Sequence, residues 1–222
     1  ITLGQLSAVM AHEIGSPLQV LEGRARSIRR NAEDVDATQR TADMLVQQVE
    51  RITRLVEQML SISRRRPPAR RPIEADGLVR GVVDLLEHEA RRRGVSLRMR
   101  STGSTKLLAD PDQIQQLVLN LLRNALDPSP RGSEVELCLE GADGQVELTV
   151  RDHGEGMDDA LRAKAFEPFF TTKADQGGSG LGLSVVRSIV QEHRGTVELS
   201  SAPDRGCVVR VRLPLDDVGG EA

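Results

Sequence analysis

Residues 64–72, RRRPPARRP, separate two parts of different character, and this division decides the fold class. The three prolines end any helix that reaches them, because proline lacks a backbone N–H and disfavours helical geometry in the preceding residue. Upstream, apolar residues recur at helical spacing; downstream, alternating strand-like segments interleave with helical ones. We therefore predict an α+β chain with a domain at 1–66, a linker at 67–72, a second domain at 73–215 and a tail at 216–222.

The first part predicts two helices, over 1–30 and 37–64, joined by the polar turn NAEDVDA. In the second helix, apolar residues alternate spacings of four and three, which is typical of a coiled coil or bundle. These residues are Leu45, Val49, Ile52, Val56 and Met59. Two helices cannot bury both faces of such a seam alone. We expect an antiparallel hairpin that pairs with a second copy in a dimeric four-helix bundle.

The second part predicts an α/β sandwich with a mixed sheet and helices on one face. Helical patterns cover 75–94, 110–130 and 182–195, and Asp112 is the expected N-cap of the second. The segments EVELCLEG and QVELTVRD, separated by ADG, indicate a β-hairpin. Further strands are expected at 95–101, 196–202 and 207–215.

Composition limits the possible functions. The formal net charge of −3 provides no global field that would recruit nucleic acid or an anionic membrane. No apolar run reaches the roughly 18 residues of a membrane span, and no signal peptide opens the chain. A first residue Ile1 indicates a fragment that lacks an upstream part. Cys138 and Cys207 are expected to be buried, reduced thiols of a cytosolic protein.

His12 is a candidate nucleophile. The apolar stripe of the first helix is centred nearly opposite His12, so its imidazole should face solvent, with Glu13 beside it and Ser16 one turn later. An exposed surface histidine usually has no special role. A neighbouring carboxylate, however, can take the proton from one ring nitrogen while the other attacks an electrophile. Pro17 removes a helix hydrogen bond nearby and would let the helix bend.

Two polar groupings in the second part are each open to two interpretations. Asn120 and Asn124 lie one helical turn apart on one face, where they could cap loops or offer oxygens to a phosphate-bound Mg²⁺. Asp152 ends a strand and is followed by Gly154 and Gly156. This pattern could form a plain turn, or its carboxylate could accept from the amino group of adenine while the glycines admit the base.

A glycine-rich segment, GGSGLGLSVV at 177–186, directly precedes a helix. Glycines let backbone N–H groups crowd a phosphate, and the helix N-terminus favours anions. The spacing is neither a Walker nor a Rossmann motif. All three phenylalanines lie within FEPFF at 166–170, where they could anchor a mobile lid, and Lys173 could reach a phosphate.

Taken in order, these segments resemble the sensor histidine kinases of two-component systems. AHEIGSPL resembles their H-box, and NLLRNA, DHGEGM, FEPFFTTK and GGSGLGL resemble their N, G1, F and G2 boxes. The resemblance implies a Bergerat-type ATP-binding fold with a lid over about residues 157–180. The nucleotide-binding residues that it implies are Asn120, Asn124, Asp152, Gly154, Gly156, Lys173, Gly178, Gly180, Leu181 and Gly182, with Asn124 and Asn120 holding Mg²⁺.

The resemblance also implies the reaction. His12 would attack the γ-phosphate of ATP, with Glu13 as base or orienting group, and the phosphoryl group would pass to an Asp of a response-regulator receiver domain. Such a protein is expected in the cytoplasm as a homodimer, with no nucleic-acid partner. Any membrane anchor would lie in a missing N-terminal part. Ser16 stands where relatives often carry Thr or Asn, and it could position water for dephosphorylation.

Two departures and two rival interpretations accompany the resemblance. Asp127 and Pro128 occupy positions where many relatives carry a basic and then an aromatic residue, so no phosphate contact is expected there. Topoisomerase, mismatch-repair and chaperone ATPases of the same fold carry a Glu four residues before the metal-binding Asn, where it activates water. This chain has Asn120 there, which favours transfer over hydrolysis. A non-catalytic dimer scaffold is the second rival.

Overall fold

The computed structural model describes residues 3–30, 34–63, 68–173 and 180–215. For parts of the first two helices, including residues 3–14, 16 and 53–63, it describes the backbone alone. The helical part and the α/β part form separate compact units, and each is described by itself. No helix in the described ranges is both long enough and apolar enough to cross a bilayer.

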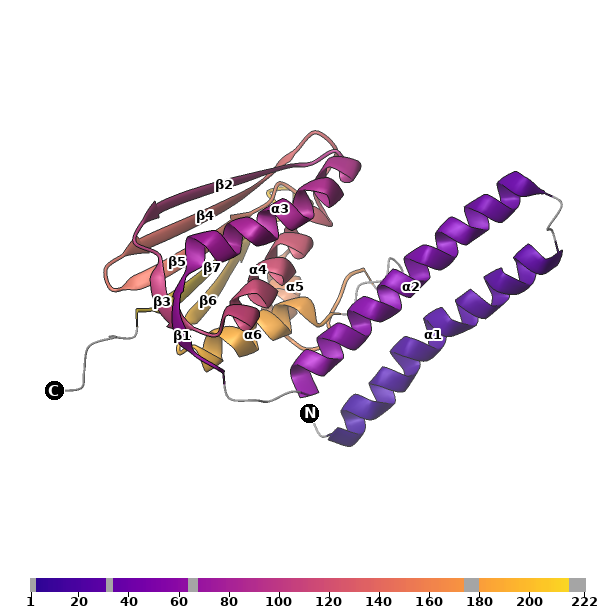
Figure 1. Ribbon diagram of the computed structural model, residues 1–222, viewed down its shortest axis with the longest axis horizontal. Coiled ribbons are helices and arrows are strands. Elements are labelled where there is room, and N and C mark those ends of the chain that lie inside the picture. Colours follow the sequence, from indigo (N-terminus) through magenta and orange to yellow (C-terminus); the bar gives the residue numbers. More distant parts are fainter. Residues whose placement is uncertain (1–2, 31–33, 64–67, 174–179, 216–222) are drawn as a thin grey trace. The chain divides into compact units, whose positions relative to one another are not determined.

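The N-terminal unit is an antiparallel helical hairpin, as predicted. Helix α1 runs over Leu3–Arg30 and α2 over Val35–Ser63, and the two lie side by side (Figure 1). Helix α2 begins two residues earlier than expected because Asp34 starts it. The Asp34 carboxylate accepts a hydrogen bond from the backbone N–H of Ala37 at 2.9 Å, which satisfies one of the free amides of the first turn. Pro17 lies inside α1.

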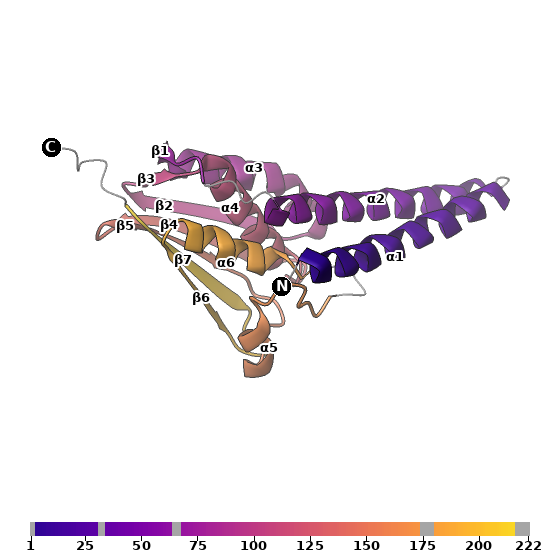
Figure 2. The same ribbon diagram turned by 90° about the horizontal axis from the view of Figure 1, so that it is seen from below.

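The second unit is a mixed sheet with helices on one face, again as predicted (Figure 1, Figure 2). Its elements in chain order are β1 (Arg71–Glu74), α3 (Ala75–Arg93), β2 (Ser96–Gly103), β3 (Lys106–Ala109), α4 (Pro111–Leu126), β4 (Glu134–Ala142), β5 (Gln145–Arg151), α5 (Asp159–Lys164), α6 (Gly182–Glu192), β6 (Thr196–Ser201) and β7 (Cys207–Pro214). The sheet order is β2-β4-β5-β7-β6, and only β2 and β4 pair in parallel.

The β4–β5 hairpin forms where the ADG signal placed it. Asp143 and Gly144 both have positive φ, 52° and 72°, which suits the tight turn that joins twisted antiparallel strands. Strands β1 and β3, a separate antiparallel pair, and the short helix α5 were not anticipated. Each has only four to six residues, too few to establish a period in the sequence.

The N-cap of α4 is Asp110, so the prediction of Asp112 was wrong. The Asp110 carboxylate accepts from the backbone amides of Asp112 and Gln113 at 3.0 and 3.3 Å. Pro111 is then the first helical residue, where its fixed φ fits and its missing N–H costs nothing. The other Asp110 oxygen accepts from the amide of Ala69 at 2.9 Å, which ties the chain before β1 to the start of α4. The helix ends at Leu126, before Pro128.

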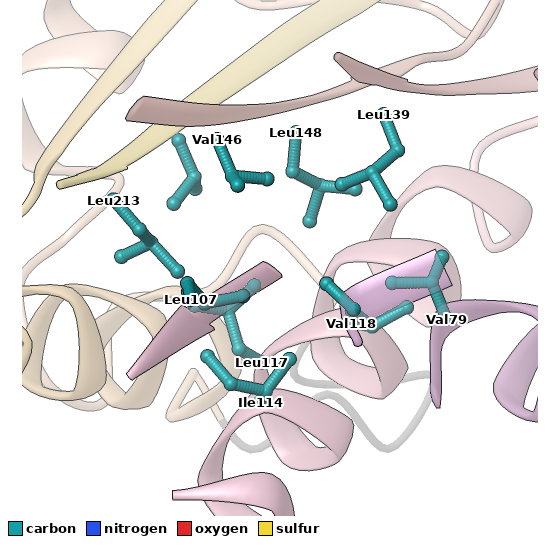
Figure 3. Close-up of a pocket in the computed structure, with 11 residues that line it drawn as sticks. Val79, Leu107, Ile114, Leu117, Val118, Leu139, Val146, Leu148 and Leu213 are labelled. Atoms are coloured by element: carbon teal, nitrogen blue, oxygen red, sulfur yellow. The ribbon is translucent and has the colours of Figure 1, made fainter. Parts of the chain in front are cut away.

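The core lies between the sheet and α3, α4 and α6, and it is built from Leu, Val, Ile and Ala. The side chains of Leu139, Val146 and Leu148 on the sheet face those of α4 across a small void of about 20 Å³ (Figure 3). With no aromatic side chain among its lining residues, this part of the core is filled by aliphatic side chains only, almost all of them branched. They leave a space about as large as one water molecule.

The other face of the sheet carries charged side chains. Glu147 on β5 binds Arg210 and Arg212 on β7 at 3.0 and 2.8 Å, and Arg212 also binds Glu198 on β6 at 3.1 Å. These two carboxylates raise the pKa of Arg212 above its ordinary value. Cys138 is half-buried, contrary to prediction, whereas Cys207 is buried. Strand alternation puts Cys138 on the face opposite buried Leu137 and Leu139.

Candidate functional site

The loop after β5 holds a buried carboxylate. Asp152 is 5% exposed, and its Oδ1 accepts hydrogen bonds from the backbone amides of Gly154 at 2.9 Å and Cys207 at 3.1 Å. Its own amide donates to the Cys207 carbonyl at 2.9 Å, which extends the β5–β7 ladder by one residue. A buried carboxylate braced in this way has a fixed orientation. It can recognise a hydrogen-bond donor such as the amino group of a base.

The two glycines after Asp152 are required by close approach. A Cβ on Gly154 would come within 2.7 Å of the Pro128 side chain. Gly156 has φ +69°, and a Cβ there would come within 2.0 Å of the Ala202 carbonyl oxygen. Any larger residue would displace the loop from its neighbours on either side. The two glycines of the D-x-G-x-G pattern therefore allow the loop after Asp152 to pack closely against Pro128 and Ala202, which a plain surface turn would not need.

Helix α4 carries two carboxamides one turn apart, and that of Asn124 lies at the start of α6. Asn120 is 8% exposed, and its Nδ2 has no hydrogen-bond partner in the described structure. Asn124 is half-buried one turn later, beside Gly182, where an added Cβ would lie 3.1 Å from Nδ2 and 3.2 Å from Oδ1 of Asn124. The Nδ2 of Asn120 is a buried polar atom without a partner among the described residues, which is compatible with a polar ligand at this helix.

The last part of the glycine-rich segment meets the FEPFF segment. The Phe169 amide donates to the Gly180 carbonyl at 2.9 Å, and a Cβ on Gly180 would come within 2.4 Å of the Phe169 carbonyl carbon. Leu181, 1% exposed, precedes the first residue of α6. The structure thus brings Gly180, Leu181 and Gly182 to the start of that helix, as predicted from the sequence.

Several predicted site residues are only partly described. His12 and Glu13 lie within α1, as does Ser16, but their side chains are outside the described residues. Gly178 lies wholly outside them. Lys173 is half-buried at the end of a described range. Their roles therefore stay predictions.

Asp127 forms an ion pair with a neighbouring helix. Its carboxylate binds the Arg93 guanidinium of α3 at 2.9 Å. An acid is accommodated here because a cation from the neighbouring helix pairs with it, and the absence of a phosphate contact at this position stays a prediction.

Two residues around Asp152 were missed from the sequence. Gly206 has φ +66°, and a Cβ there would lie 2.1 Å from the Asp152 carbonyl oxygen; Cys207 follows and contacts the same aspartate. The signal available was the sequence DRGC between two predicted strands, which marks a tight turn. Nothing local indicated that this turn would lie against Asp152, because β5 and β7 are adjacent only in the folded sheet.

Family comparisons match both units. Residues 2–68 match the His Kinase A (phospho-acceptor) domain. Residues 109–217 match the histidine kinase-, DNA gyrase B- and HSP90-like ATPase family. Together the two matches cover most of the chain.

Similar whole proteins include sensor histidine kinase ZraS of Klebsiella oxytoca, 33% identical over 219 residues. That match covers 97% of this chain and 47% of the relative. Sporulation kinase A of Bacillus subtilis is 29% identical over 95% of this chain and 34% of its own length. The chain thus spans less than half the length of these relatives. A solved complex of histidine kinase ThkA with the response regulator TrrA is 25% identical, with a TM-score of 0.79 over 96% of this chain and 62% of that one.

Proposed function

Because this chain belongs to the sensor histidine kinases, we propose that it transfers the γ-phosphoryl group of ATP to His12 and then to an Asp of a response-regulator receiver domain. The observation that carries the proposal is the braced, buried Asp152 carboxylate in a unit that also holds Asn124 at the start of α6. A phospho-acceptor domain in the same chain supplies the residue to be modified.

In the first step a ring nitrogen of His12 attacks the γ-phosphorus. A P–N bond forms, the P–O bond to ADP breaks, and ADP leaves with the electron pair. Glu13, the next residue, takes the proton from the other ring nitrogen or orients the ring. In the second step a receiver carboxylate attacks the same phosphorus, the P–N bond breaks and the histidine recovers a proton. Ser16 could position water for a separate reaction, in which water attacks the phosphorylated Asp of the regulator and releases inorganic phosphate.

The nucleotide would be held by the α/β unit. Asp152 accepts from the adenine amino group, while Gly154 and Gly156 keep the loop beneath it compact. Gly178, Gly180, Leu181 and Gly182 precede or open α6, where backbone N–H groups and the helix dipole favour phosphate. Lys173 would offset negative charge on the transferred group.

The carboxamides of α4 suit a magnesium ion that is also held by phosphates. Mg²⁺ prefers oxygen ligands and usually takes few of them from protein. Asn124 and Asn120 would supply amide oxygens, and the unpartnered Nδ2 of Asn120 among the described residues is compatible with a polar ligand nearby. The ion would neutralise phosphate charge. Asn120 carries no carboxylate with which to activate water, which favours transfer to His12 over hydrolysis.

We further propose that the partners are a second copy of the chain, through α1 and α2, and a receiver domain, with no nucleic acid and no direct membrane contact in this segment. The net charge of −3 supports the last two points, and a cytoplasmic site of action follows from the cytoplasmic pool of ATP. Large apolar side chains exposed on the hairpin support pairing.

The test is incubation with γ-labelled ATP and Mg²⁺, followed by acid and base treatment. We expect an acid-labile, base-stable label on the protein, which marks phosphohistidine, and its complete loss in His12→Ala with nucleotide binding intact. The matched control is His88→Ala, since His88 is an exposed histidine on α3 and lies outside the proposed nucleotide-binding residues. If His12→Ala is still labelled, His12 is not the residue that is phosphorylated. If the unmodified chain releases labelled phosphate from ATP but is not itself labelled, the ATPase interpretation is favoured.

A further inference from the structure

The turn between β6 and β7 is bonded along its length to the loop that carries Asp152. The Gly206 amide donates to the Gly154 carbonyl at 3.1 Å, and the Asp204 amide donates to the Glu155 carbonyl at 2.7 Å. Two further bonds join Asp152 and Cys207, as described above. All of these bonds are made by backbone groups or by the Asp152 carboxylate. The backbone of the loop 152–157 therefore follows that of the turn 201–207 closely.

Ser201 adds a side chain to this junction at its outer end. Its hydroxyl oxygen lies 2.7 Å from the Gly206 carbonyl, 2.8 Å from the Met157 amide and 3.1 Å from the Cys207 sulfur. The single hydroxyl hydrogen is donated to the Gly206 carbonyl. The oxygen then accepts from the Met157 N–H and from the Cys207 thiol, so its hydrogen-bonding capacity is used in full.

The position of Ser201 relates it to recognition of the base. It fixes Met157, the residue at which the chain leaves the Asp152 loop and passes to α5 through the N-cap Asp158. It also bonds both Gly206, which lies against the Asp152 backbone, and Cys207, whose amide holds the Asp152 carboxylate. The Arg162 guanidinium of α5 donates to the Ser201 carbonyl at 3.4 Å, so α5 is tied to the same residue.

We propose that Ser201 is a positioning residue for base selection: its hydroxyl fixes the loop 152–157 so that the Asp152 carboxylate faces the amino group of adenine. This inference rests on the proposed function. A carboxylate held in one orientation should accept from an amino group and repel an oxo group at the same place. Without the hydroxyl, the loop gains freedom and the carboxylate loses this discrimination.

The experiment compares binding of ATP with binding of ITP, which carries an oxo group in place of the adenine amino group, by titration calorimetry on the whole chain. In Ser201→Ala we expect about tenfold weaker binding of ATP, less than about twofold change for ITP, and so a loss of preference of about tenfold. Ser200→Ala is the matched control, because Ser200 is the exposed neighbour on the opposite face of β6. Its preference should equal that of the unmodified chain.

A second measurement follows the Met157 amide directly. Its hydrogen exchange should accelerate in Ser201→Ala and stay unchanged in Ser200→Ala. Should Ser201→Ala fail to fold, Ser201→Thr, which keeps the hydroxyl, should retain the ATP preference, and Ser201→Cys, a weaker acceptor, should lose part of it. A Ser201→Thr chain that folds but has lost the preference would overturn the inference.

Different results would contradict the role of Ser201 and the proposed kinase function. An unmodified chain that prefers ATP, with Asp152→Asn abolishing that preference and Ser201→Ala preserving it, contradicts the role of Ser201 alone. Equal losses for ATP and ITP in Ser201→Ala would also contradict it, since that is the result of a merely structural role. An unmodified chain that binds neither nucleotide overturns the proposed function and with it this inference.

Discussion

The two units differ in how they bury their apolar side chains. In the α/β unit, Leu and Val side chains from the sheet, α3, α4 and α6 are almost fully buried, and Leu85 is the large apolar residue that the described part leaves exposed. The described part of the hairpin leaves six exposed: Leu18, Val20, Val35, Met44, Val46 and Val49. A sheet covered by helices closes a core by itself, whereas two helices have a second apolar face that only further helices can cover. The α/β unit should therefore be stable alone, and the hairpin should depend on a second copy.

The largest expected effect separates the chemistry of the two units. Asn124→Ala removes a carboxamide from the α/β unit and should weaken binding of Mg²⁺–ATP about tenfold or more, because an oxygen ligand is lost. His12→Ala should leave the same titration unchanged, since His12 belongs to the hairpin. The measurement is calorimetric titration with and without Mg²⁺. An Asn124→Ala chain that binds as tightly as the original would exclude Asn124 from the site.

The next effect tests the core of the α/β unit. Leu86→Ala in α3 should lower the free energy of unfolding by about 3 kcal/mol, because Leu86 is 2% exposed and its truncation leaves a cavity. Leu85→Ala is the matched control on the same helix, since Leu85 is 70% exposed and should change stability by less than about 0.5 kcal/mol. Urea titration measures both. Similar losses for the two would mean that Leu85 is covered by something outside the unit.

A moderate effect tests the hairpin. Val49→Glu should weaken self-association of residues 1–66 about tenfold or more, because Val49 is on the predicted seam, is 53% exposed in the single chain, and would bury a charge in the pair. Arg40→Glu is the control, since Arg40 is exposed on the opposite side of the same helix, about two and a half turns before Val49. Sedimentation over a range of concentrations measures the association. A fragment that is folded and monomeric before substitution would end the bundle assignment.

The smallest effect concerns the void in the α/β core. Val79→Ile or Val118→Ile adds one methylene beside a space of about 20 Å³ and should raise the free energy of unfolding by about 0.5–1 kcal/mol. The hairpin should be unaffected. Thermal unfolding of residues 68–215 detects the gain. A decrease with both substitutions would show that the lining side chains cannot make room, as in overpacked cores.

Much of the fold could be predicted because the periodicity of apolar residues and the residues that end helices and strands are local features of the sequence. Local sequence patterns predicted three features: the apolar seam over Leu45–Met59, the turn at Asp143 and Gly144, and helix α6. The N-cap of α4 was misplaced by two residues, since Asp110 and Asp112 are the same residue type and Pro111 decides between them only once it occupies the first helical position. Strands β1 and β3 were missed because each has only four residues and is stable only when paired with the other.

The candidate site divides in the same way. Asp152, Asn124 and the glycines are chemically conspicuous, so the sequence by itself determined the residue types and their order along the chain. That the β6–β7 turn lies against the Asp152 loop, that Gly154 packs on Pro128, and that Ser201 bonds Met157 were decided only by tertiary structure. These contacts join residues about 25 to 55 positions apart, and they exist because strand order in the sheet sets which loops meet, a property of the whole folded chain.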